Sequence, residues 1–108
     1  MTPVPPAAVP EYCATLVVRD AVTKLDALAV IALAVDRPVS DARGVHPYVE
    51  LEGGARAEIE IPKFGEPPPL AIDVYSTLSH DHAAMSALAL LGVLETATAW
   101  TVKPDFVL

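Results

Sequence analysis

Two segments of the 108-residue chain have the composition of helices but lack a polar side. Residues 27–35 contain no polar residue, and within residues 83–94 only Ser86 and Gly92 interrupt the apolar run. A surface helix normally carries a polar face opposite its apolar stripe, whereas a helix that is apolar all round is covered on more than one side. A chain of this length has too little other protein to cover two such helices. The pattern therefore predicts a partner surface, although alanine, abundant in both segments, is also harmless in water.

Hydrophobic periodicity divides the rest of the chain into strands and helices. The predicted elements are a strand at 12–19, a helix at 21–36, a hairpin at 46–61, a strand at 70–75, a helix at 79–96 and a strand at 100–103. This order, β-α-β-β-β-α-β, predicts an α+β protein of the ferredoxin-like sandwich kind, with an antiparallel or mixed sheet and two helices on one face.

The chain has the length of a single domain. Residues 1–10 contain four prolines, which prevent a helix and favour extended structure. We therefore expect a proline-rich N-terminal arm at 1–10 and a single α+β domain at 11–108.

Acidic side chains alternate with apolar ones along the predicted hairpin. A three-residue loop at 53–55 keeps the apolar residues on one face and sets Glu50 opposite Glu58. Glu50, Glu58 and Tyr75 are the candidate binding residues of this face. The alternative is a solvated sheet face whose charges prevent edge-to-edge aggregation.

Three histidines are candidate metal ligands. His80 and His82 stand at the predicted start of the second helix, and His46 lies before the hairpin. Neutral imidazoles bind divalent metals such as Zn²⁺ or Ni²⁺, with a nearby carboxylate as a further ligand. The alternative is helix-start chemistry, in which Ser79 caps the helix and Asp81 meets its positive end.

Charge and cysteine content exclude several classes of protein. The 14 acidic residues outnumber the 7 basic ones, for a net charge of −7, and nucleic-acid or anionic-membrane binding needs a basic footprint. No apolar run reaches the ~20 residues that span a bilayer. Cys13 is the only cysteine, so an internal disulfide is excluded, which fits a reducing compartment. We therefore expect a soluble, cytoplasmic protein that contacts neither nucleic acid nor membrane.

These observations favour a non-enzymatic oligomeric interaction or small-ligand-binding module that needs no cofactor. The expected assembly is a homo-oligomer, a dimer, through helices 21–36 and 79–96, with a different protein as the other partner to consider. The alternative function is a small metal-dependent or acid–base enzyme that uses His80, His82 and nearby carboxylates.

Overall fold

The fold is given by a computed structural model of the chain. The structure describes residues 11–19, 24–44, 46–60 and 70–106. The predicted N-terminal arm at 1–10 lies outside the described residues, as do residues 61–69 between the hairpin and the next strand. A single-domain organisation of 11–108 stays a prediction.

Six strands form one open sheet in which every neighbouring pair is antiparallel. The order across the sheet is β2-β3-β4-β5-β1-β6. The strands are β1 (Tyr12–Val18), β2 (Val39–Ser40), β3 (Tyr48–Glu50), β4 (Arg56–Glu60), β5 (Leu70–Ser76) and β6 (Val102–Pro104). β1 and β5 pair along their full length of seven residues and form the centre of the sheet.

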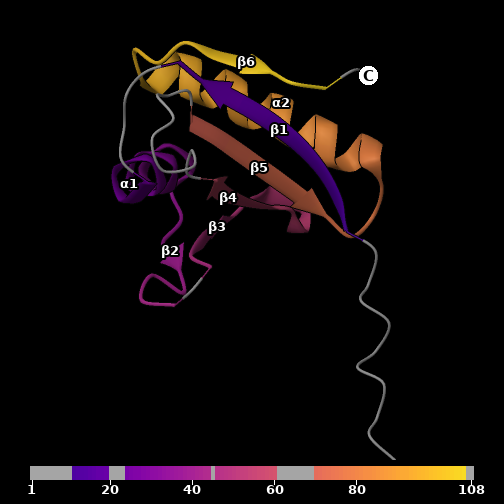
Figure 1. Cartoon of the computed structure of the whole chain (residues 1–108), viewed down its shortest axis with the longest axis horizontal. Coiled ribbons are helices and arrows are strands. Elements are labelled where there is room, and N and C mark those ends of the chain that lie inside the picture. Colours follow the sequence, from indigo (N-terminus) through magenta and orange to yellow (C-terminus); the bar gives the residue numbers. More distant parts are fainter. Residues whose placement is uncertain (1–10, 20–23, 45, 61–69, 107–108) are drawn as a thin grey trace, which may run out of the picture.

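Two helices cover one face of this sheet. α2 (His80–Ala97) runs along β1 and β5, and α1 (Lys24–Val35) is seen nearly end-on beside it (Figure 1). Alternation in the strands explains the layer, because the buried apolar residues of β1 and β5 point to the helices while the intervening residues, buried Asp73 among them, face away. The largest fully buried side chains come from both layers: Leu16, Leu28, Ile31, Ile72, Leu94, Val18, Val49 and Val74.

Local chemistry fixes the helix ends. The Ser79 hydroxyl accepts a hydrogen bond from the backbone N–H of His82 at 3.0 Å, which confirms Ser79 as the N-cap of α2. At the other end, the Thr98 hydroxyl and backbone N–H both donate to the Leu94 carbonyl. α1 ends at Val35, and the next residue, Asp36, has a left-handed φ of 56°, which lets the Arg37 N–H donate to the Ala32 carbonyl at 2.9 Å.

The sequence-based fold prediction is confirmed at the level of class. The protein is α+β, with an antiparallel sheet and two helices. The strand order differs from the predicted five-strand sandwich, because β2 and β3 extend the sheet beyond β4, and the ferredoxin-like arrangement is not confirmed. β2 was missed because it has only two residues, too few for alternation to be visible.

The hairpin has a loop of the predicted length, but the loop is centred one residue earlier. The Leu51 N–H donates to the Ala55 carbonyl at 2.8 Å, so the loop is the 3₁₀ turn η1 (Glu52–Gly54). Glu50 therefore pairs with Arg56, and Tyr48 pairs with Glu58. The predicted Glu50–Glu58 pair is wrong, because a turn that starts at Glu52 changes every partner while keeping the apolar residues on the helix side.

No helix among the described residues is both long enough and apolar enough to cross a membrane.

Candidate functional site

The sheet face turned away from the helices, here called the open face, gathers polar side chains in two rows. The registers of β1, β5, β4 and β3 set these rows. One row holds Thr15, Asp73, Glu58 and Tyr48, and the next holds Cys13, Tyr75, Arg56 and Glu50. An ordinary solvent-facing sheet would carry such groups as separate, hydrated side chains, whereas here they contact one another.

Arg56 is the centre of these contacts. Its Nη1 lies 2.7 Å from Glu11 Oε2, and its Nε lies 2.8 Å from Glu58 Oε2. The guanidinium carbon lies 4.7 Å from the centre of the Tyr75 ring, within cation–π distance. Burial by itself would lower the pKa of Arg56, but the hydrogen bonds to Glu11 and Glu58 outweigh it and raise that pKa above its ordinary value.

Asp73 is a buried carboxylate in the middle of the open face. It is 9% exposed, and its Oδ1 accepts a hydrogen bond from the Thr15 hydroxyl at 2.7 Å. Burial first, and then the negative charge of Asp73, raise the pKa of Tyr75 to about 12. Burial also raises the pKa of the Cys13 thiol, with a smaller contribution from Asp73. Both neighbours of this carboxylate are therefore neutral at physiological pH.

The open face is hollowed beside Arg56. A hollow of about 500 Å³ is lined by side chains from β3, β4, β5 and the segments before β1 and β3. Its lining residues are Glu11, Asp41, His46, Tyr48, Arg56, Glu58 and Tyr75. A second hollow of about 450 Å³ shares Tyr48 and Arg56 with the first and adds Glu50 and Arg37. The two tyrosines and three carboxylates of the first hollow thus surround one paired guanidinium.

The candidate binding residues from the sequence fall at this place. Glu58 and Tyr75 line the same hollow, whereas Glu50 lines the neighbouring one, across Arg56. Arg56 itself escaped the sequence analysis, because only the register of β4 against β5 reveals that it lies opposite Tyr75. The feature of the sequence that could have pointed to Arg56 is that it is a single arginine among the acidic residues of the hairpin.

The candidate metal ligands are not brought together. His46 lines the hollow on the open face, and His80 is exposed at the start of α2. His82 lies on the helix side, with its Nδ1 2.6 Å from the hydroxyl of the buried Ser76. Within the described part of the chain, no three His, Cys, Asp or Glu side chains form a group that could hold a metal ion. Metal binding and the enzyme that would use it stay predictions.

Comparison of the chain with protein-family models, curated protein sequences and solved structures returned no match.

Proposed function

We propose that the protein is a non-enzymatic binding module whose open sheet face binds a small organic cation. The observation that carries the proposal is the hollow around Arg56, in which carboxylates outnumber basic groups and two tyrosines supply aromatic surface. Pockets in which a few polar groups converge beside perturbed titratable residues are the usual places for ligands.

The excess of negative charge in the hollow favours a positively charged ligand. Glu11, Asp41 and Glu58 line it, and Arg56 is the one lining residue that is always charged positively. Because Arg56 is paired with Glu11 and Glu58, an anion would meet a neutralised guanidinium and an excess of carboxylate. A cation gains both the remaining negative charge and the field of a chain with a net charge of −7.

The tyrosines select an organic cation over a bare metal ion. Tyr75 already holds the guanidinium of Arg56 over its ring, so this environment accommodates a delocalised cation on an aromatic face. Tyr48 lines both hollows and offers the second ring. An ammonium or guanidinium group with an apolar body matches this combination of ring and carboxylate.

The test is a titration of the full chain with amines, followed by NMR chemical shifts. Spermidine and choline are the cationic probes, and inorganic phosphate is the anionic one. We expect saturable shifts at Tyr48, Arg56 and Glu58 with the amines, weakened by added salt because the contact is electrostatic. Glu58→Gln should weaken binding about tenfold, the scale of one charged contact of about 1.4 kcal/mol.

Glu95→Gln is the matched control, because Glu95 is an exposed carboxylate on α2, on the other side of the sheet. It removes the same charge from the chain and should leave amine binding unchanged. The absence of saturable shifts with any amine, equal weakening in both variants, or preferential binding of phosphate would each overturn the proposal.

Two finer assignments also stand as our proposals. We propose that β4, β5, β1 and β6, together with α1 and α2, form a ferredoxin-like unit to which β2 and β3 add an edge; the supporting observation is the order of these four strands. We also propose a cytoplasmic location, supported by the single cysteine. An experimental structure tests the first proposal, and fractionation of the native host tests the second.

A further inference from the structure

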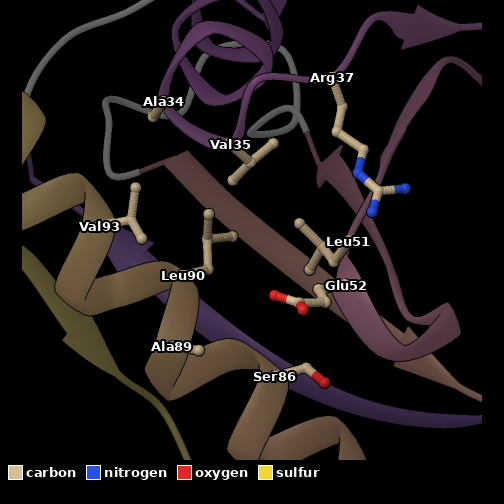
Figure 2. Close-up of a pocket in the computed structure, with 9 residues that line it drawn as sticks. All are labelled: Ala34, Val35, Arg37, Leu51, Glu52, Ser86, Ala89, Leu90 and Val93. Atoms are coloured by element: carbon tan, nitrogen blue, oxygen red, sulfur yellow. The ribbon is translucent and has the colours of Figure 1, made fainter.

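A groove opens where the C-terminal end of α1 meets the middle of α2. Figure 2 shows Val35, Leu51, Leu90 and Val93 pointing toward one another from α1, the hairpin and α2. The groove has a volume of about 310 Å³ and is mostly apolar. Its lining residues are Ala34, Val35, Arg37, Leu51, Glu52, Ser86, Ala89, Leu90 and Val93. It lies on the helix side of the sheet and shares no described lining residue with the hollow of about 500 Å³ on the open face, although Arg37 and Leu51 also line the second hollow.

Both helices that form the groove also carry exposed apolar side chains. Leu33 on α1 is 82% exposed, Met85 on α2 is 61% exposed, and Val93 is 37% exposed. Met85, Ala89 and Val93 follow one another at intervals of four, which aligns them along one stripe of α2. Leaving such side chains in water costs free energy in proportion to their apolar surface, which contact with a partner surface recovers.

The same surface is the part of the protein with the least charge. Between Asp26 and Asp36 on α1, and between Asp81 and Glu95 on α2, neither helix carries an acidic or basic residue other than His82. Two copies of a chain with a net charge of −7 repel each other over most of their surfaces. They approach most closely, at least electrostatic cost, through this uncharged helix surface.

Two charges of opposite sign stand at the rim of the groove. Arg37 and Glu52 are both exposed and line it, and neither forms an ion pair with another described residue. In a dimer with two-fold symmetry the same patch is used twice, so a contact of Arg37 with the partner's Glu52 would occur in two equivalent copies. The described part of this surface thus carries one unpaired charge of each sign, and a second copy offers each of them a charge of the opposite sign.

We propose that a second copy of this chain occupies the groove, with Met85 and Val93 buried at the contact and Arg37 of each copy paired with Glu52 of the other. The open faces of the two copies then point outward and stay accessible. The groove and the hollow of about 500 Å³ in which we propose the ligand binds share no described lining residue, so the contact does not depend on that ligand.

The experiment is sedimentation equilibrium of the full chain over a range of concentrations. We expect a monomer–dimer equilibrium, and Val93→Asp should raise the dimer dissociation constant at least about tenfold, because it buries an unpaired carboxylate. Lys103→Gln, on exposed β6, is the control, because it lowers the net charge by the same amount as Val93→Asp does, and it should leave the equilibrium unchanged. Leu90→Asp is unsuitable as a probe, because Leu90 is only 2% exposed and its replacement would unfold the monomer.

Charge reversal gives a second test that does not depend on the fold tolerating Val93→Asp. Arg37→Glu and Glu52→Arg should each weaken self-association about tenfold, since each sets like charges against each other twice. An equimolar mixture of these two variants should recover the dimer, because every contact again joins opposite charges. A wild-type chain that stays monomeric at high micromolar concentration, or a mixture that associates no better than its components, would overturn the proposal.

Discussion

The Ser76 hydroxyl lies 2.6 Å from Nδ1 of His82, and this hydrogen bond joins the end of β5 to the first turn of α2. Ser76 is only 2% exposed, and its Oγ also accepts from the backbone N–H of Leu78 at 3.1 Å. This buried hydroxyl thus forms hydrogen bonds both to the backbone of the turn after β5 and to the imidazole of His82. His82, which the sequence analysis names as a candidate metal ligand, is thus hydrogen-bonded to a serine through Nδ1.

Replacement of Ser76 should measure the strength of this junction. Ser76→Ala removes the hydrogen-bond partner of both His82 and the Leu78 N–H, so we expect a loss of about 1–3 kcal/mol in the free energy of unfolding. Urea denaturation followed by circular dichroism provides the measurement. Thr77→Ala is the control: Thr77 is exposed, and its loss should change stability by less than about 0.5 kcal/mol. Equal effects of the two replacements would contradict the role assigned to Ser76.

His82 also contacts the hairpin turn, and two neighbouring glycines isolate that contact. Gly53 and Gly54 have φ angles of 85° and 90°, so an alanine at either position strains the backbone. A Cβ at Gly53 would lie 3.1 Å from Nε2 of His82, whereas a Cβ at Gly54 meets no atom within 4 Å. Gly53→Ala should therefore destabilise the protein more than Gly54→Ala does.

The same pair of glycine variants in a His82→Ala background completes this experiment. With the imidazole removed, the two alanine replacements should cost the same, because only backbone strain remains. Denaturant midpoints of the six proteins provide the comparison. If Gly53→Ala remains the more damaging replacement without His82, the extra cost arises from something other than the imidazole.

The elements of this fold were largely visible in the sequence because alternation and helix signals are local. Strand β1 reads as buried Ala14, Leu16 and Val18 between polar or half-buried neighbours, and Ser79 caps α2 as its sequence position predicted. The turn of the hairpin was placed one residue too late. A hydrophobic pattern fixes which face of a strand is buried, but a shift of two residues in the cross-strand partners leaves that face unchanged, so the pattern could not choose between the two registers.

Only part of the candidate site could be predicted from the sequence, because its residues are brought together by the pairing of strands. Glu58 and Tyr75 attract notice as an acid and an aromatic residue on predicted strands. Their meeting around Arg56 depends on β4 pairing with β5 in a particular register, which no local pattern specifies. The burial of Asp73 depends in the same way on β1 and β5 being neighbours, because Thr15 on β1 supplies its hydrogen bond.

Asp36 should be replaceable with a gain in stability. It ends α1 with a φ of 56°, a left-handed conformation that favours glycine, and its negative charge lies at the negative end of the helix. Asp36→Gly relieves both costs, and we expect a gain of about 0.5–1 kcal/mol in unfolding free energy. Asp36→Asn removes only the charge and should give a smaller gain. Loss of stability in both variants would show that the carboxylate makes a compensating contact.

Tyr75 should make the protein sensitive to alkaline pH. Its pKa is raised from 10.0 to about 12 in the folded protein, so folding favours the protonated phenol. The stability that this group contributes is complete below about pH 10 and is lost as the pH rises through about 12, because the unfolded chain releases its proton first. Urea denaturation at a series of alkaline pH values should show this decline in the wild-type protein.

Two variants identify the phenol as the titrating group. Tyr75→Phe keeps the ring beneath Arg56 but has no proton to release, so its stability should fall less steeply between pH 10 and about 12. Asp73→Asn removes a charge that raises the pKa of Tyr75, and should bring the ultraviolet absorbance change of the ionising phenol to lower pH. A Tyr75→Phe protein that declines as steeply as the wild type would assign the alkaline transition to another group.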